Sequence, residues 1–207
     1  MLTPKSSESG RSGRPTPQRL LDAAETLMRT TGLANATTKA IAREAGCSEA
    51  ALYKHFANKE ELFVRVLLER LPNAGALMAA LAAAPGERPV PERLADIAGH
   101  AARFYADAMP IAGSLFAEPA LLSRHREGLA EIGKGPHAVL DALVDCLRRE
   151  REHGRIRADA DPRAAAALLL GACFQRAFFL HFSGPAVVEP VADFAPAVAA
   201  TVWAALR

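Results

Sequence analysis

The side chains best suited to chemistry lie in residues 37–56, TTKAIAREAGCSEAALYKHF. Glu49, Ala50, Tyr53 and Lys54 recur at the three-to-four-residue spacing that places side chains on one face of a helix. That face combines a carboxylate, a methyl group, a phenol and an ammonium, which can contact base edges and phosphate oxygens. A helix presented in this way fits the major groove of duplex DNA. We therefore predict a surface that reads DNA.

Two short helices must position this face, and the segment holds an apolar stripe on each side of Gly46-Cys47-Ser48. Gly46 can take the positive φ that ends a helix, and Ser48 can cap the next helix through its hydroxyl. The stripes are Ile41, Ala42 and Ala45 before the turn, and Ala51, Leu52 and Phe56 after it. The pattern predicts a helix-turn-helix, with Cys47 in a buried packing position of the turn.

An enzymatic function has less support in the sequence. Tyr53, His55 and Lys59 lie close together, but no nucleophile elbow, phosphate-binding loop or pair of carboxylates accompanies them. The histidines lack the spacing of metal ligands, and the cysteines form no CxxC pair. These residues are His100, His125, His137, His153 and His181, and Cys47, Cys146 and Cys173. We expect neither an enzyme nor a metal or cofactor site.

The positive charge of the chain is concentrated in its first third. The whole chain has a net charge of +2, while residues 1–70 contain eleven Lys/Arg and eight Asp/Glu. This excess coincides with the helix-turn-helix and agrees with a nucleic-acid partner. No uninterrupted run of eighteen apolar residues and no leader-like segment occurs, so we expect a cytoplasmic protein that does not contact a membrane.

The remaining pattern predicts an all-α fold of about nine helices. Residues 1–14, rich in Ser and Gly, form either a flexible basic arm that contacts DNA or a tail without a role. Residues 15–75 form a head of three helices, and a fourth helix begins after the cap Asn58. Residues 76–207 form a larger helical domain. Its candidate helices are 91–108, 110–117, 119–132, 136–153, 162–182 and 187–206.

The last two candidate helices differ from the others. Residues 162–182 are apolar on nearly every side, and residues 187–206 are rich in Ala and Val with few charges. A helix that is apolar all round must be covered by more than one neighbour. We therefore predict a homodimer with a four-helix contact through these two helices. The alternative is that both are interior helices of one large domain.

Residues 16 to about 70 resemble the TetR family of one-component bacterial transcriptional regulators. The resemblance rests on Gly32 after the first helix, TT at 37–38, the run IAREAG, and LYKHFANKEELF at 52–63, which is its most specific part. Beyond about residue 80 the chain resembles the family only as an all-helical domain of suitable length. The resemblance implies a repressor that binds an inverted repeat of double-stranded DNA as a dimer, with residues 76–207 serving ligand binding and dimerisation.

The same resemblance implies which residues contact DNA. Thr37 or Thr38 would cap the first motif helix, whose start would hold a phosphate, and Tyr53 and His55 would contact phosphates. Glu49 would either accept a hydrogen bond from a cytosine amino group or merely favour the start of its helix. The full set is Thr37, Thr38, Lys39, Ser48, Glu49, Ala50, Tyr53, Lys54, His55 and Lys59.

The resemblance also implies a cavity for an apolar or amphipathic effector. Filling it would favour an arrangement that does not bind DNA, with Pro72 where the fourth helix bends. The candidate lining residues are Leu71, His100, Phe104, Tyr105, Met109, Phe116, His137, Leu140, Cys173, Phe174, Gln175 and Phe178. Two alternatives stay open: a helical small-molecule carrier or interaction protein with a degenerate DNA-binding head, and a DNA-binding regulator without an effector.

Overall fold

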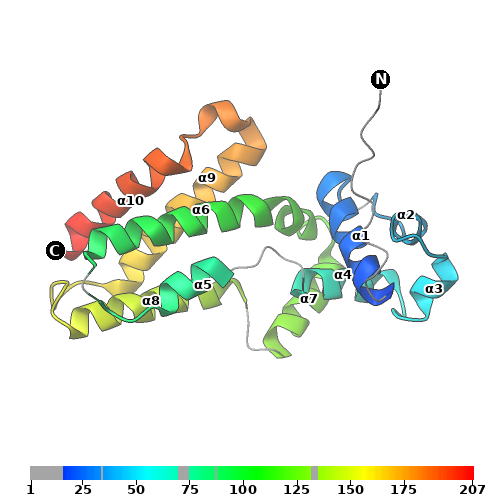
Figure 1. Cartoon of the computed structure of the whole chain (residues 1–207), viewed down its shortest axis with the longest axis horizontal. Coiled ribbons are helices and arrows are strands. Elements are labelled where there is room, and N and C mark those ends of the chain that lie inside the picture. Colours follow the sequence, from blue (N-terminus) through cyan, green and yellow to red (C-terminus); the bar gives the residue numbers. More distant parts are fainter. Residues whose placement is uncertain (1–15, 34, 70–74, 87, 132–134) are drawn as a thin grey trace, which may run out of the picture. The chain divides into compact units, whose positions relative to one another are not determined.

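The computed structural model describes residues 16–33, 35–69, 75–86, 88–131 and 135–207. Within these ranges every regular element is a helix, ten α-helices and one 3-10 helix, which confirms the predicted all-α class (Figure 1). The chain separates into two compact units, of which the first holds residues 16–69 and 113–128 and the second the other described residues. The predicted arm at 1–14 lies outside the described residues, and the predicted domain boundary at residue 75 stays a prediction.

The first unit is built on α1 (Thr16–Thr30), which packs against both α2 (Thr38–Glu44) and α4 (Lys59–Glu69). α2 packs in turn against the short α3 (Glu49–Tyr53), and most of α7 (Pro119–Glu131) belongs to this unit. The apolar stripe of α1 is buried at Leu20, Leu21, Ala24 and Met28. Because these side chains recur at helical spacing, one face of α1 supports the helix-turn-helix.

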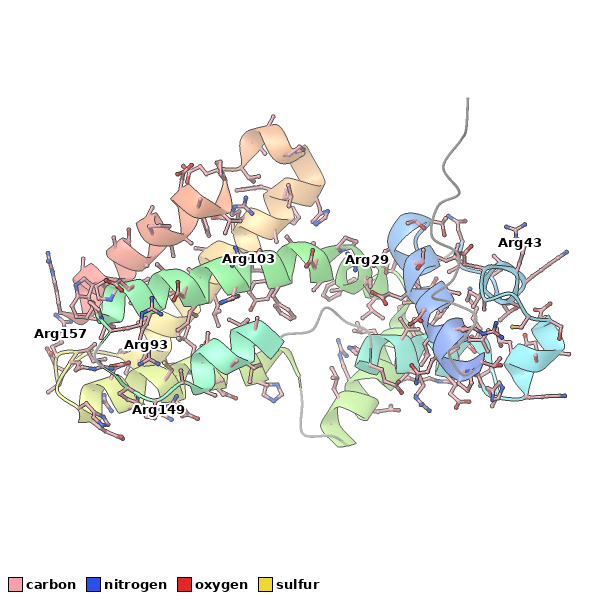
Figure 2. The ribbon with its side chains drawn as sticks, in the orientation of Figure 1. Arg29, Arg43, Arg93, Arg103, Arg149 and Arg157 are labelled. Atoms are coloured by element: carbon pink, nitrogen blue, oxygen red, sulfur yellow. The ribbon has the colours of Figure 1, made fainter. Side chains whose placement is uncertain are left out.

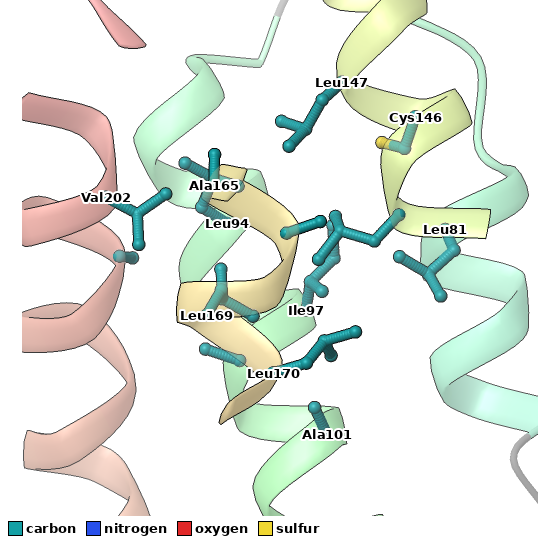
Figure 3. Packing of buried hydrophobic residues seen from close by; sticks show 14 of the residues in the cluster. Leu81, Leu94, Ile97, Ala101, Cys146, Leu147, Ala165, Leu169, Leu170 and Val202 are labelled. Atoms are coloured by element: carbon teal, nitrogen blue, oxygen red, sulfur yellow. The ribbon is translucent and has the colours of Figure 1, made fainter. Parts of the chain in front are cut away.

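Five helices contribute to the core of the second unit: α5 (Gly75–Ala82), α6 (Val90–Leu115), α8 (Pro136–Glu152), α9 (Pro162–Ser183) and α10 (Val191–Leu206). α9 packs against both α8 and α10, and Leu169 in its middle is fully buried. Figure 3 shows Leu81, Leu94, Leu147 and Val202, one from each of the other four helices, in the same cluster of buried residues. Each such side chain stabilises the fold by about 1.5–3 kcal/mol when fully buried.

The predicted break between two helices at Pro110 was wrong. Residues 91–108 and 110–117 were expected to form two helices, but α6 runs through the proline as one helix. A proline within a helix has no N–H to donate, which frees the carbonyl four residues earlier. Here that carbonyl belongs to Ala106, and it accepts a hydrogen bond from Nε2 of His181 on α9, at 2.7 Å. A partner 75 positions away thus satisfies the group that the proline leaves free.

The last helix begins at Val191 and not at residue 187 as predicted. Pro185–Val187 form the 3-10 helix η1, and Val188 after it is extended, with φ −121° and ψ 140°. Pro190 then precedes α10. A residue before a proline is disfavoured in the helical region, so the apolar pattern begins earlier than the helix itself.

α9 leaves a long apolar stripe uncovered within one copy of the chain. By length and composition it could cross a membrane, a criterion that core helices also meet, yet only 33% of its most apolar window is buried. The exposed residues of this stripe are Ala164, Ala167, Leu168, Gly171, Phe174, Phe178, Phe179 and Phe182, with the polar Gln175 among them. α9 is therefore not an interior helix of the protomer, as one of the sequence interpretations held.

A buried ion cluster joins three segments of the second unit. Glu150 on α8 is 2% exposed and pairs with Arg93 at the start of α6 and with Arg155 after α8. Arg93 also donates through Nη2 to the carbonyl of Ala83, at 2.8 Å. Arg149 donates to a carbonyl at the end of α5, also at 2.8 Å, and Figure 2 shows both arginines. The cluster thus holds the connection between α5 and α6 against α8.

His125 on α7 is buried, and its Nδ1 has no hydrogen-bond partner among the described residues. Burial lowers the pKa of this imidazole below its ordinary value. The unfolded chain therefore binds the proton more readily than the folded chain. The stability that neutral His125 contributes is complete above about pH 6.5 and is lost as the pH falls toward the lowered folded pKa.

We expect His125→Leu to reduce the loss of unfolding free energy between about pH 7 and pH 5, because the buried proton-binding group is removed. Urea denaturation at both pH values measures this loss. His137→Leu, at an exposed position, is the control and should keep the wild-type pH dependence. If His125→Leu lost as much unfolding free energy between pH 7 and pH 5 as the wild type does, other titratable groups would be responsible for that loss.

Candidate nucleic-acid interface

The turn between α2 and α3 has the geometry of a helix-turn-helix. Gly46 has a φ of +66°. Its amide donates to the carbonyl of Arg43 at 3.1 Å, and the amide of Cys47 donates to that of Ala42 at 2.9 Å. This pair of bonds is the Schellman motif, which favours glycine at the left-handed position. Cys47 is half-buried, so it is less buried than its predicted packing position in the turn implied.

Hydroxyl groups fix the start of both helices. Oγ1 of Thr37 accepts from the amide of Ala40 at 3.2 Å, and Oγ of Ser48 accepts from the amide of Ala51 at 3.1 Å. The predicted cap at Ser48 is confirmed, and of the two threonines considered for α2 it is Thr37 that caps the helix. Each cap stabilises its helix by about 1 kcal/mol, and together they fix the direction in which α3 leaves the turn.

The two faces of α3 differ in burial. Leu52 is fully buried and Phe56 is 2% exposed, so this face packs into the first unit. Tyr53 is 50% exposed, and Ala50 and Lys54 are exposed as well. The polar face of α3 is therefore available to a partner.

A side-chain hydrogen bond links α2 to α3. Oγ1 of Thr38 in the first turn of α2 donates to Oε1 of Glu49, the first residue of α3. Both residues are half-buried. The sequence analysis named both as separate DNA contacts and did not foresee this bond, because eleven positions separate them.

The start of α4 is capped from both sides. Oδ1 of Asn58 accepts from the amide of Glu61 at 2.8 Å, and Oε2 of Glu61 accepts from the amide of Ala57 at 2.7 Å. The predicted cap at Asn58 is thus confirmed. Nζ of Lys59 lies 4.9 Å from the ring centroid of Phe63, a cation–π contact that holds the ammonium beside α4.

The first unit brings all ten predicted DNA-contacting residues into or beside the helix-turn-helix and the start of α4. Seven are exposed: Thr37, Lys39, Ser48, Ala50, Tyr53, Lys54 and His55. Three are half-buried: Thr38, Glu49 and Lys59. Their contacts with DNA stay predictions.

The sequence analysis missed Arg43, an exposed cation in the last turn of α2. Figure 2 shows its side chain extending away from α2. Arg43 follows Lys39 by four positions, and residues at this spacing share a helix face. From this spacing the sequence could have predicted Arg43, like Lys39, as a DNA-contacting residue.

The residues predicted to line a pocket do not share one environment. Leu71, like the proposed hinge Pro72, lies outside the described residues. Phe116 is 75% exposed and belongs to the first unit, whereas the other described candidates belong to the second. Of these, His137, Phe174, Gln175 and Phe178 are exposed, and His100, Phe104, Tyr105, Met109 and Leu140 are half-buried. The pocket formed by these residues stays a prediction, because residue type alone does not distinguish pocket, core and surface.

Cys173 and Tyr105 lie in the more buried part of this set. The Cys173 thiol is fully buried and donates to the carbonyl of Ala98 at 3.5 Å, and burial raises its pKa to about 12. Burial also raises the pKa of Tyr105, whose ring meets that of Phe174 edge-on with centroids 5.6 Å apart. Both groups are therefore uncharged near neutral pH and provide apolar surroundings.

Comparison with known proteins identifies relatives of the first unit. The profile of the family described as bacterial regulatory proteins, tetR family, matches residues 20–66. The uncharacterized HTH-type transcriptional regulator YvkB of Bacillus subtilis (strain 168) is 40% identical over 65 residues. That match covers 31% of this chain and 34% of YvkB, about a third of its length.

Solved structures resemble nearly the whole chain. A protein from Mesorhizobium loti MAFF303099, described as a TetR-family transcriptional regulator, superposes with a TM-score of 0.72 at 21% identity, covering 96% of each chain. The transcriptional regulator FadR from Bacillus subtilis, solved in complex with stearoyl-CoA, gives a TM-score of 0.65 at 17% identity, covering 92% of this chain and 99% of FadR. At these identities the likeness shows the fold.

Proposed function

We propose that this chain, which belongs to the TetR family of bacterial regulatory proteins, is a sequence-specific DNA-binding transcriptional regulator of the cytoplasm. The observation that carries the proposal is the pair of capped helices joined at Gly46, which exposes the polar face of α3. A helix supported in this way enters the major groove with its first residues at the base edges. A family of regulators also agrees with the expectation that the chain is not an enzyme.

Phosphate contacts would supply most of the affinity. Tyr53, Lys54 and His55 are exposed at the end of α3, and Lys39 is exposed in the first turn of α2. Phenol, ammonium and imidazole groups hold phosphate oxygens without regard to base sequence. Binding should therefore weaken steeply as the salt concentration rises, because bound cations are released from the DNA by each contact.

Tyr53→Phe tests the phosphate contact, because it removes the phenolic O–H and keeps the ring. A lost hydrogen bond to a charged group should weaken binding by about tenfold for every duplex alike. Fluorescence anisotropy with a selected duplex and with random duplexes measures both affinities. Tyr105→Phe, in the second unit, is the matched control and should bind as the wild type does.

Wild-type protein that binds all duplexes with equal affinity would contradict the regulator proposal. A Tyr53→Phe protein that loses affinity for the selected duplex alone would instead make Tyr53 a base-reading residue. A footprint on genomic DNA provides the second test, since a dimeric regulator should protect an inverted repeat.

A homodimer through α9 and α10 accounts for the uncovered stripe on α9. Leu168, Phe178 and Phe182 are 65%, 43% and 78% exposed in the protomer, and Gly171 is one of the exposed residues between them. A continuous apolar face of this kind marks an interface. A second copy would cover it by the same face, as a two-fold contact requires, and would present two copies of α3 to the two half-sites.

An apolar or amphipathic small molecule is the proposed effector, and its binding would release the DNA, so that the protein acts as a repressor. The support is the aromatic group of the second unit, Phe104, Tyr105 and Phe174, and the stearoyl-CoA complex of the similarly folded FadR. Adding stearoyl-CoA or shorter acyl compounds to the protein–duplex complex should lower its anisotropy. Unchanged anisotropy with every compound would favour a regulator without an effector, and ligand binding without specific DNA binding would favour the carrier alternative.

A further inference from the structure

The geometry points to Glu49 as the residue that selects a cytosine in each half-site, with Thr38 as the positioning residue that holds it. This inference rests on the proposed function and names the base that the same surface would read. Glu49 is the first residue of α3, and the first residues of a recognition helix meet the base edges.

Thr38 is available to orient Glu49 because its neighbour caps α2. Thr37 accepts the capping hydrogen bond from the amide of Ala40, and Thr38 donates its hydroxyl to Oε1 of Glu49. Oε2 of Glu49 has no protein partner among the residues that the structure describes. Fixing a glutamate side chain costs conformational entropy. The hydrogen bond from Thr38 restricts the Glu49 side chain already in the free protein, so less entropy is lost when DNA binds.

Glu49 also lies at the capped start of α3. Ser48 caps α3, so the carboxylate lies in the first turn beside the free backbone amides. Glu49 can therefore approach a base edge as a carboxylate with one oxygen already fixed by Thr38.

A carboxylate only accepts hydrogen bonds, which restricts the base that it can read. In the major groove guanine presents two acceptors, and thymine presents an acceptor and a methyl group. Adenine places its N7 acceptor beside the N6 donor, so a carboxylate there meets repulsion as well as attraction. Cytosine presents the N4 amino donor and is the base that suits a carboxylate.

The residues on either side of Glu49 are less suited to accept a hydrogen bond from cytosine. The hydroxyl of Ser48 already accepts from the amide of Ala51 at 3.1 Å. Ala50 is exposed and offers only a methyl group, which suits a thymine methyl but forms no hydrogen bond. Discrimination of a cytosine at the start of α3 would thus depend on the Glu49 carboxylate.

Selection from a random duplex library with full-length protein tests the assignment. The wild-type consensus should hold a cytosine at one symmetric position, preferred by about tenfold over each other base. Glu49→Gln should move the preference at that position from cytosine to adenine, because an amide matches the N6 donor and N7 acceptor. Thr38→Val keeps the side-chain shape and the carboxylate, so it should keep the consensus and lower the preference for cytosine severalfold.

Glu60→Gln is the matched control, since it removes the same charge from an exposed position in the first turn of α4 and should leave the consensus unchanged. Circular dichroism establishes that each variant is folded. A Glu49→Gln protein that keeps the wild-type preference at every position would overturn the assignment and leave the regulator proposal intact. Unchanged preference in Thr38→Val would overturn the positioning role, and a wild-type protein that enriches no duplex would overturn the regulator proposal itself.

Discussion

Replacing Glu150 by glutamine is expected to lower the free energy of unfolding by about 3–5 kcal/mol, the cost of removing one partner of a buried ion pair. The Glu150 side chain is 2% exposed, and that of its partner Arg93 is 10% exposed. The amide leaves the Arg93 guanidinium buried without an opposite charge, and the Arg155 guanidinium loses the same partner. Urea denaturation followed by circular dichroism, at one fixed protein concentration, measures the change.

The matched control is Asp145→Asn on the same helix. Asp145 pairs with Arg148 at 3.0 Å, but its side chain is 59% exposed, so its loss should change stability by less than about 1 kcal/mol. If Glu150→Gln and Asp145→Asn were equally stable, the Glu150 cluster would not be holding the connection between α5 and α6. Because Arg93 also donates to Ala83 in that connection, protease cleavage within residues 83–86 should become faster in Glu150→Gln.

Gly171→Arg is expected to abolish the proposed homodimer and to weaken binding to an inverted-repeat duplex by about 100-fold or more, since the two heads would no longer bind as one unit. Gly171 lies in the exposed stripe of α9, and a Cβ added there would meet nothing within 4 Å in the protomer. The arginine side chain therefore does not clash within the protomer, and arginine has a higher helix propensity than the glycine it replaces. It places a charge in the centre of the apolar face that a second copy would cover.

Sedimentation velocity measures the oligomeric state, and anisotropy on full and half-site duplexes measures the affinities. Gly113→Arg is the matched control, because Gly113 is an exposed glycine of α6 with nothing near an added Cβ, and it should remain dimeric. Half-site affinity should be the same in both variants. A dimeric Gly171→Arg protein with wild-type DNA affinity would place the interface elsewhere.

The helix-turn-helix could be predicted in detail because its signals are local. Thr37 and Ser48 each accept a hydrogen bond from the amide three residues later, and Gly46 ends α2 through backbone bonds within the turn. The start of α4 was predictable for the same reason, since Asn58 bonds to an amide three residues later.

Features that depend on distant partners could not be predicted. Pro110 indicated a break in α6, yet His181 on α9 binds the carbonyl that the proline frees. Thr38 and Glu49 each fitted a separate contact with DNA, and only the structure shows the hydrogen bond between them. Phe116 has the residue type of a core or pocket residue, and only the structure shows that its side chain is exposed.

By itself the sequence determined the helical class, the helix-turn-helix and the resemblance of residues 16 to about 70 to a regulator family, because spacing, caps and the left-handed glycine act over a few residues. Only the tertiary structure decided which apolar residues are core and which remain uncovered. Both kinds occur in α9, where Leu169 is fully buried and its neighbour Leu168 is 65% exposed. The same residue type stabilises the protomer at one position and offers a surface at the next, because burial depends on neighbours that only folding brings near.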